Sequence, residues 1–308
     1  MAPRIIAAFN SRYFFSPINS LHLRYKSKTQ KHKAQKQKHK QQNSIAMKKV
    51  FYITVAILAM ASCTQKSKTL EYTTETLSAK KEVPYADGKI GKVSIDCSYE
   101  YPSAGTPEAT LKALQKSLII DALGDSLATD FKKAFDDDIQ EIIDIYKEEV
   151  DDIYRNMEDG KQPEEYMVTW EYNGTGKFGS THSSVTSYIT ELSSYTGGAH
   201  GMYYTLGSLY SLKDGNRISQ DQYFIDSYED QLTTLLFKYL RDFEGNELSS
   251  GEDDEFTPQP YPNDNIYFTE NGVVFTYPPY EIASYAQGQL HAEIPWAEIE
   301  PLIRKEYK

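Results

Sequence analysis

His200 is the side chain in this sequence that most invites a chemical role, because it lies in the stretch Gly197-Gly198-Ala199-His200-Gly201. An imidazole can act as a general base near neutral pH, but it needs an acid or nucleophile partner, and none adjoins it in the sequence. The glycines equally permit a tight turn between two strands, with the imidazole bonded to a local carbonyl. We favour the turn and keep catalysis by His200 as the alternative.

Other patterns of catalytic residues are incomplete. His182 and His291 are the other two histidines after residue 63, and their spacings match no zinc motif. The sequence has no Gly-x-Ser-x-Gly stretch, and Glu281 has no second carboxylate at a spacing that would identify a glycosidase. We therefore predict no catalytic residues, no metal and no cofactor, with an envelope enzyme that acts on glycan through His200 or Glu281 as the rival hypothesis.

Tyrosines are concentrated in the second half of the chain. Aromatic rings with a polar tip are common both in sheet cores and on recognition surfaces, and alternation along strands would bury roughly half of these. We expect the remainder to form a platform for a sugar ring or a protein partner. With His200 and Glu281, the ligand-binding candidates are Tyr195, Tyr203, Tyr204, Tyr280 and Tyr285.

One cysteine follows an export pattern. Met47-Lys48-Lys49 is a short basic start, residues 50–60 are apolar but too few to span a bilayer, and small residues precede Cys63. The sequence predicts a lipoprotein signal peptide at 47–62, lipidation of Cys63 and a tether at 63–70, with 1–46 as a leader or a misassigned start. An ordinary cleaved signal and a membrane anchor are the alternatives. We expect attachment to the inner or outer membrane through the lipid, facing the periplasm or the exterior.

The charge is divided unevenly along the chain. Residues 1–62 hold 12 of the 33 Lys and Arg residues and none of the 44 Asp and Glu residues, so residues 63–308 have 21 basic and 44 acidic groups, a formal charge of −23. Such a body repels nucleic-acid phosphates and attracts cationic partners. We therefore predict no nucleic-acid binding. Cys97 alternates with apolar residues and is expected to face a core as a small hydrophobe.

The hydrophobic periodicity predicts an α+β fold in which helices pack on one face of an antiparallel meander. Helices are expected at 108–123, 126–157, 219–224 and 228–243, and strands at 93–101, 185–192, 203–212 and 289–294. Hairpin turns are expected at Asn173-Gly174-Thr175-Gly176 and Glu270-Asn271-Gly272.

The tripeptide Asp125-Ser126-Leu127 matches an O-glycosylation pattern of secreted bacterial proteins, although a pattern of three residues also recurs by chance.

Two stretches carry a family resemblance. The first runs from Tyr195 through His200 to Gly215, and the second from Ile266 to Trp296 includes Pro279-Tyr280-Glu281-Ile282-Ala283. Both resemble RsiV-like extracellular domains (domain of unknown function 3298), and the region before them resembles the N-terminal module of PdaC-type peptidoglycan deacetylases. The Thr-Phe-Asp-Asp type of deacetylase metal motif is missing, so the resemblance implies the sensing or binding half of such proteins, of which one type binds lysozyme.

These observations predict two modules, a PdaC-type module at 71–200 and an RsiV-like domain at 201–308. We expect a cell-envelope lipoprotein with a non-catalytic domain that binds a peptidoglycan fragment or a cationic protein such as lysozyme.

Overall fold

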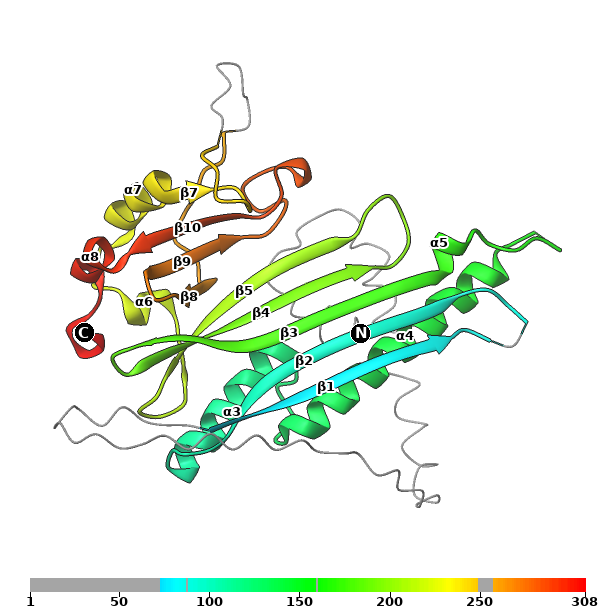
Figure 1. Cartoon of the computed structure of the whole chain (residues 1–308), viewed down its shortest axis with the longest axis horizontal. Coiled ribbons are helices and arrows are strands. Elements are labelled where there is room, and N and C mark those ends of the chain that lie inside the picture. The colour runs from blue at the N-terminus through cyan, green and yellow to red at the C-terminus, as the bar shows by residue number, and fades with distance from the viewer. Residues whose placement is uncertain (1–72, 87, 159, 249–256) are drawn as a thin grey trace.

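The computed structural model describes residues 73–308 apart from 87, 159 and 249–256. The leader, signal peptide, tether and Cys63 all lie outside the described residues. Within the described ranges, no helix combines the length and apolar character needed to cross a bilayer. The chain forms a long sheet with two helices along one face and a smaller helix-covered sheet at one end (Figure 1).

The long sheet has six strands in the order β1-β2-β3-β4-β5-β6. Neighbouring strands are antiparallel except β2 and β3, which are parallel because two helices return the chain along the sheet before β3 begins. From β3 to β6 the sheet is the expected meander. The strands are β1 (Thr73–Pro84), β2 (Lys92–Ala104), β3 (Thr169–His182), β4 (Val185–Tyr195), β5 (Met202–Ser211) and β6 (Arg217–Ile218).

Helices α3 (Glu108–Leu123) and α4 (Phe131–Arg155) cover one face of this sheet, and the short α5 (Glu165–Val168) leads into β3. Strand β2 turns alternate side chains toward the helices, and Cys97 among them is 1% exposed. This burial raises the pKa of the Cys97 thiol to about 12, so the thiol stays protonated. The buried stripe of α4 packs on the same residues, as in the contact of Phe135 with Tyr99. The predicted inward orientation of Cys97 is confirmed.

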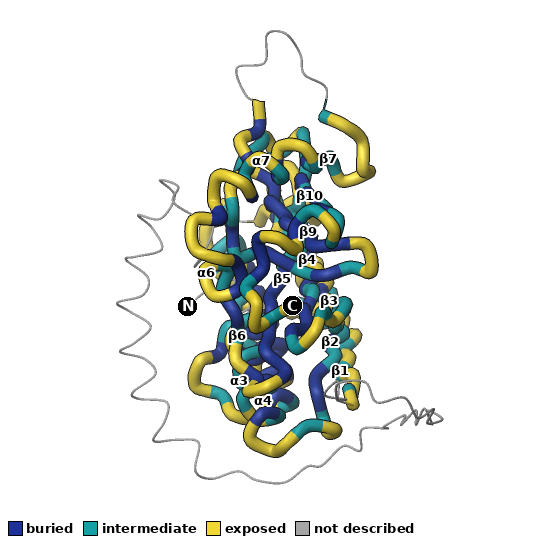
Figure 2. The backbone as a smooth tube through the Cα atoms, turned by 90° about the vertical axis from the view of Figure 1, so that its left-hand side faces the viewer, coloured by how far each residue is buried: buried dark blue, intermediate teal, exposed yellow. Residues whose placement is uncertain are grey.

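The second sheet has four antiparallel strands in the order β7-β10-β9-β8. Helix α7 lies against β10, and apolar side chains from both form a second core. Figure 2 shows the buried backbone running through both sheets. The elements are α6 (Gln220–Tyr223), α7 (Glu229–Tyr239), β7 (Leu240–Arg241), β8 (Ile266–Phe268), β9 (Gly272–Tyr277), η1 (Tyr285–Gln287), β10 (Leu290–Pro295), α8 (Trp296–Ile299), η2 (Glu300–Leu302) and η3 (Lys305–Tyr307).

A buried amide joins the two sheets. The Asn265 side chain, 2% exposed, accepts a hydrogen bond from the Gly207 backbone of β5. Its Nδ2 donates to the Thr205 carbonyl of β5 at 3.2 Å and to the Thr276 carbonyl of β9 at 3.1 Å. Because one side chain bonds to both sheets, their relative position is fixed at this seam.

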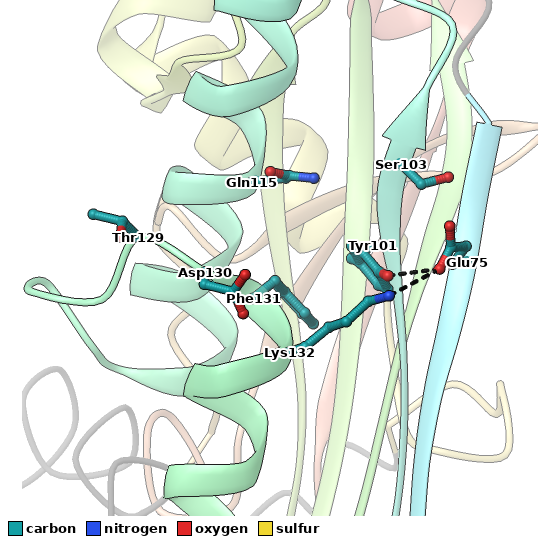
Figure 3. Close-up of a pocket in the computed structure, with 8 residues that line it drawn as sticks. All are labelled: Glu75, Tyr101, Ser103, Gln115, Thr129, Asp130, Phe131 and Lys132. Carbon is teal, nitrogen blue, oxygen red and sulfur yellow. Dashed lines mark hydrogen bonds and ion pairs between the residues drawn. The ribbon is translucent and has the colours of Figure 1, made fainter. Parts of the chain in front are cut away.

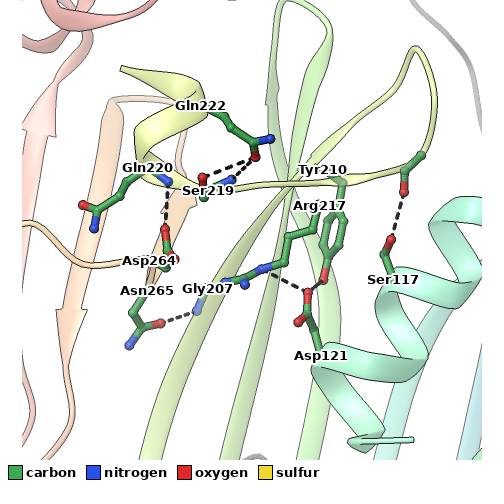
Figure 4. Close-up of polar contacts among 11 residues, drawn as sticks. Ser117, Asp121, Gly207, Tyr210, Arg217, Ser219, Gln220, Gln222, Asp264 and Asn265 are labelled. Atoms are coloured by element: carbon green, nitrogen blue, oxygen red, sulfur yellow. Dashed lines mark hydrogen bonds and ion pairs between the residues drawn. The ribbon is translucent and has the colours of Figure 1, made fainter. Parts of the chain in front are cut away.

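A second set of contacts fastens α3 to the hairpin between β5 and β6 (Figure 4). Tyr210 donates to the Asp121 carboxylate at 2.7 Å, and Arg217 forms an ion pair with the same oxygen at 3.3 Å. Ser117 donates to the Gly215 carbonyl at 3.1 Å. Helix α3 and the β5–β6 edge of the long sheet are therefore held together by polar groups as well as by the core.

The structure confirms the α+β class and the hairpin at Glu270-Asn271-Gly272, which connects β8 and β9. The hairpin predicted at residues 173–176 is wrong, because β3 continues straight through it. A Cβ on Gly174 would lie 2.6 Å from the Tyr99 hydroxyl, and one on Gly176 would collide with Tyr188. These glycines make room for tyrosines below the strand instead of turning it.

The predicted start of the second long helix at 126 is also wrong. Helix α4 begins at Phe131, where the Asp130 side chain accepts a hydrogen bond from the Lys133 backbone at 2.7 Å. The residues before it form a turn, and Leu127, which lies inside the predicted helix, is 86% exposed.

Candidate functional site

Four of the candidate side chains meet on one surface, which we call the aromatic cluster: His200, Tyr203, Tyr280 and Tyr285. The His200 ring stacks on Tyr285 with centroids 3.8 Å apart and 22° between the planes. Tyr280 and Tyr203 approach Tyr285 at 5.5 Å and 6.3 Å. The cluster joins the β4–β5 connection and the start of β5 to the segment between β9 and β10, so residues 77 to 85 apart in sequence build one surface.

Backbone contacts fix the rings. Tyr285 donates from its hydroxyl to the Gly201 carbonyl at 2.8 Å, and His200 Nδ1 lies 3.0 Å from the same carbonyl. A carbonyl only accepts, so this contact places the proton of a neutral His200 on Nδ1. His200 Nε2 is then an acceptor 3.4 Å from the Tyr280 hydroxyl. The cluster therefore has a defined hydrogen-bonding pattern before any ligand arrives.

The local backbone of this segment is unusual. Tyr280 has a φ of +73°, a left-handed conformation that costs a non-glycine residue free energy. Gly288 has a φ of +74°, and a Cβ there would lie 2.7 Å from the Tyr203 hydroxyl. Tyr280 is nonetheless 56% exposed. The strained backbone therefore holds a large aromatic ring toward solvent, as in many ligand sites.

The other two tyrosine candidates lie apart from these rings. The Tyr195 hydroxyl donates to the Gly198 carbonyl at 3.0 Å and so braces the turn that carries His200. Tyr204 is 5% exposed and, as the next residue along β5, faces the opposite side of the sheet from Tyr203. Burial raises the pKa of the Tyr204 hydroxyl above its ordinary value. The structure thus places Tyr195 in support of the cluster and Tyr204 in the interior.

Glu281 follows Tyr280 but points inward. Its Oε1 accepts hydrogen bonds from Tyr261 at 2.9 Å and from Asn263 Nδ2 at 3.1 Å, while its buried Oε2 has no hydrogen-bond partner among the described residues. Burial raises the pKa of Glu281 to about 7, and the two hydrogen bonds oppose that rise only in part. The carboxyl group is therefore close to half-protonated at neutral pH.

Tyr261 and Asn263 are site residues that the sequence did not identify. Asn263 also donates to the Thr276 carbonyl at 3.1 Å and receives a hydrogen bond from the Asn265 backbone, so Glu281 connects to the seam between the sheets. No helix or strand was predicted at either residue. Their partner lies 18 to 20 residues further on, beyond a hairpin, and no local pattern reports such a contact.

Within the described part of the chain, no group of three His, Cys, Asp or Glu side chains could hold a metal ion. His182 stacks on Trp296 with centroids 4.2 Å apart, and His291 lies on β10, so neither joins His200. The exposed rings of the cluster offer a π surface with hydroxyl and imidazole groups at its edge, which is a common way to hold a sugar ring.

A separate polar pocket of about 270 Å³ lies between the start of α4 and strands β1 and β2 (Figure 3). On its wall, Tyr101 stacks on Phe131 with centroids 5.0 Å apart and donates to Glu75 at 2.7 Å. Lys132 pairs with the same carboxylate at 3.3 Å. Glu75 and Lys132 of this pocket therefore already pair with each other, and Asp130 caps α4.

Comparisons with known proteins identify part of the chain. Residues 219–297 match the family described as "Protein of unknown function (DUF3298)". A crystal structure of a DUF3298 family member from Bacteroides fragilis has 18% sequence identity and a TM-score of 0.61, covering 77% of this chain and 95% of that one. A DUF3298 family protein from Pseudomonas aeruginosa PAO1 has 16% identity and a TM-score of 0.49, covering 77% and 96%. No curated protein matches this chain.

The matched segment runs from the residue before α6 into α8 and includes Tyr261, Tyr280, Glu281 and Tyr285, while His200 precedes it. Residues 219–297 therefore match the model of a family of unknown function, DUF3298, and the chain is similar in fold to a solved member of that family.

Proposed function

We propose that this chain is a cell-envelope lipoprotein whose folded part binds a glycan fragment, of the kind found in peptidoglycan, without transforming it. The observation that carries the proposal is the aromatic cluster, in which His200 stacks on Tyr285 and the Tyr280 ring lies beside them with its hydroxyl 3.4 Å from His200 Nε2. A site that is ordered before binding loses less entropy when a ligand arrives.

Glu281 supports this site from the inner side. It follows Tyr280 in the chain, and its Oε1 accepts hydrogen bonds from Tyr261 and Asn263. Sugar rings present apolar C–H faces together with hydroxyl groups, so aromatic rings edged by hydroxyl and imidazole groups match their chemistry. A glycosidase would need a second carboxylate opposite the first, whereas the hydrogen-bond partners of Glu281 are Tyr261 and Asn263.

The envelope location rests on the sequence. The pattern at residues 47–63 predicts lipidation of Cys63, and the resemblance to RsiV-like domains and to the PdaC-type module points to proteins that work outside the cytoplasm. Acyl chains on Cys63 would hold the folded part at the membrane surface.

A second candidate ligand is a cationic protein such as lysozyme. The observation that favours it is the charge of −23 on residues 63–308, which would accelerate the encounter with a basic partner. Binding of this kind weakens steeply as the salt concentration rises, whereas glycan stacking does not.

The glycan proposal predicts that Tyr280→Ala weakens binding of a purified muropeptide about tenfold or more, a loss of about 1.4 kcal/mol, because it removes the exposed ring. Calorimetric titration of the full chain measures the affinity. Tyr166→Ala is the matched control, because Tyr166 is 52% exposed outside the cluster and its loss should leave the affinity unchanged.

Salt-sensitive binding of lysozyme, with no muropeptide binding, would replace the glycan by the cationic protein. Release of new reducing ends by the native chain, abolished in folded His200→Ala, would instead establish the enzyme hypothesis.

The anchor is tested separately. Cells fed a labelled fatty acid are expected to incorporate the label into the native chain, because the thiol of Cys63 is the predicted acylation site, and Cys63→Ser should remove the label completely. Cys97→Ser is the control, since Cys97 is buried in the core and should not affect labelling. An unlabelled native chain that fractionates with cytosolic proteins contradicts the lipoprotein proposal.

A further inference from the structure

The turn between α3 and α4 is built to present one serine. Helix α3 ends at Leu123, and Gly124 adopts a left-handed φ of +66° that directs the chain away from the helix axis. The Asp125 backbone N–H then bonds back to the Ile119 carbonyl at 3.3 Å. The first residues of the turn are thus fixed to the end of the helix.

Asp125 and Lys116 hold the rest of the turn. Asp125 is 6% exposed, and its Oδ1 accepts hydrogen bonds from the backbones of Leu127 at 2.8 Å and Ala128 at 3.0 Å. The Lys116 ammonium donates to the carbonyls of Ser126 and Ala128. In this Asx turn the backbone groups on either side of Ser126 are hydrogen-bonded, and the side chains of Ser126 and Leu127 at its tip point to solvent.

Ser126 and Leu127 are the residues at that tip. Ser126 is exposed, and its hydroxyl has no hydrogen-bond partner within the described part of the chain. Leu127 is 86% exposed, the highest value among the exposed large apolar side chains of that part. A single exposed leucine is not informative by itself. Here, however, the leucine lies beside a free hydroxyl in a turn that Asp125 and Lys116 hold with four hydrogen bonds.

We propose that Ser126 is the acceptor of an O-linked glycan, with Leu127 as the apolar residue that the modifying enzyme contacts. Three observations support this: the match of Asp125-Ser126-Leu127 to an O-glycosylation tripeptide, the free exposed hydroxyl, and the exposed apolar neighbour. The aspartate of the tripeptide is buried, so its role in this chain is to shape the turn. The proposal rests on the envelope location proposed above and is independent of the aromatic cluster.

The chemistry is a glycosyl transfer from a phosphate-linked sugar donor. Ser126 Oγ forms a bond to the anomeric carbon, the bond from that carbon to the donor phosphate oxygen breaks, and the phosphate leaves with the electron pair. The hydroxyl proton passes to a base of the transferase. Nothing is oxidised or reduced, and the product carries a neutral, hydrated group on the outer side of the α3–α4 layer.

The chain contains its own comparison. Asp226-Ser227-Tyr228 begins in the same way, but Asp226 pairs with Arg304 at 2.7 Å and Tyr228 is 4% exposed. Ser227 is exposed with a φ of +62°. The residue that follows its exposed side chain is therefore buried, unlike Leu127 after Ser126, and we expect Ser227 to stay unmodified.

The test is mass spectrometry of the full chain purified from the envelope fraction of the organism that encodes it. We expect an added mass of one or more sugar residues, mapped to the peptide with Ser126 and completely lost in Ser126→Ala. Ser126→Thr, which restores a hydroxyl, should retain it, and Leu127→Lys should reduce it severalfold. Ser227→Ala should leave it unchanged.

Several outcomes overturn the assignment. An unmodified chain in the envelope fraction contradicts glycosylation of Ser126 but agrees with the envelope location. A chain found unmodified in the cytosol removes both proposals. A sugar mapped to another residue, or a phosphate on Ser126, also contradicts it.

Discussion

Asn265→Ala is expected to lower the free energy of unfolding by about 2–4 kcal/mol, the largest effect we predict for a single polar side chain. The Gly207 N–H loses the acceptor that the Asn265 side chain provides, and the carbonyls of Thr205 and Thr276 each lose a donor. Those carbonyls keep other donors, Thr276 Oγ1 and Asn263 Nδ2, so the main cost comes from the unpaired amide and the cavity. Denaturant titration of the full chain measures the change.

Asn173→Ala is the matched control. Asn173 is exposed on β3 and donates a single hydrogen bond to Ser193 at 3.2 Å, so its loss should cost less than about 1 kcal/mol. Equal effects of the two substitutions would show that Asn265 does not hold the sheets together. Because Asn265 positions β9 and the segment after it against β5, Asn265→Ala should also weaken muropeptide binding although it removes no ring of the aromatic cluster.

Sequence patterns correctly predicted the helices and strands whose ends and buried faces are set by neighbouring residues in the chain. Helix α3 has the predicted bounds, because Pro107 and Gly124 limit it on either side. The alternation around Cys97 correctly predicted a strand with one buried face. In contrast, β1 was not predicted. It is an edge strand with largely exposed side chains, and it is defined by pairing with β2, which its own sequence does not reveal.

The errors and the missing site residues have a common physical origin. Gly174 and Gly176 resemble turn residues because a sequence does not show Tyr99 and Tyr188, which occupy the space where their Cβ atoms would lie. Similarly, the sequence singled out His200 and Tyr285 separately, but their stacking depends on how the two sheets meet. Tyr261 and Asn263 are functional candidates only because the chain returns to place Glu281 beside them.

The protonation of Glu281 leads to the second large effect. Between pH 5 and pH 8, the free energy of unfolding of the native chain should fall by about 2 kcal/mol relative to that of Glu281→Gln. The folded-state pKa of about 7 lies above the ordinary value of 4.5, so the folded chain binds this proton more tightly than the unfolded chain does. The contribution of Glu281 to the free energy of unfolding is therefore fully present below pH 4.5 and is lost as the pH rises through about 7.

Glu281→Gln isolates this effect because the amide keeps an oxygen for Tyr261 and Asn263 and cannot ionise. Any penalty for the extra buried N–H applies at every pH and cancels when the two pH values are compared. Glu293→Gln is a second comparison, since that carboxylate accepts from Thr269 instead of from Tyr261 or Asn263, and the contribution of Glu281 should persist in this variant. If the native chain and Glu281→Gln lose stability in parallel, Glu281 is ionised throughout this range and its burial is compensated within the site.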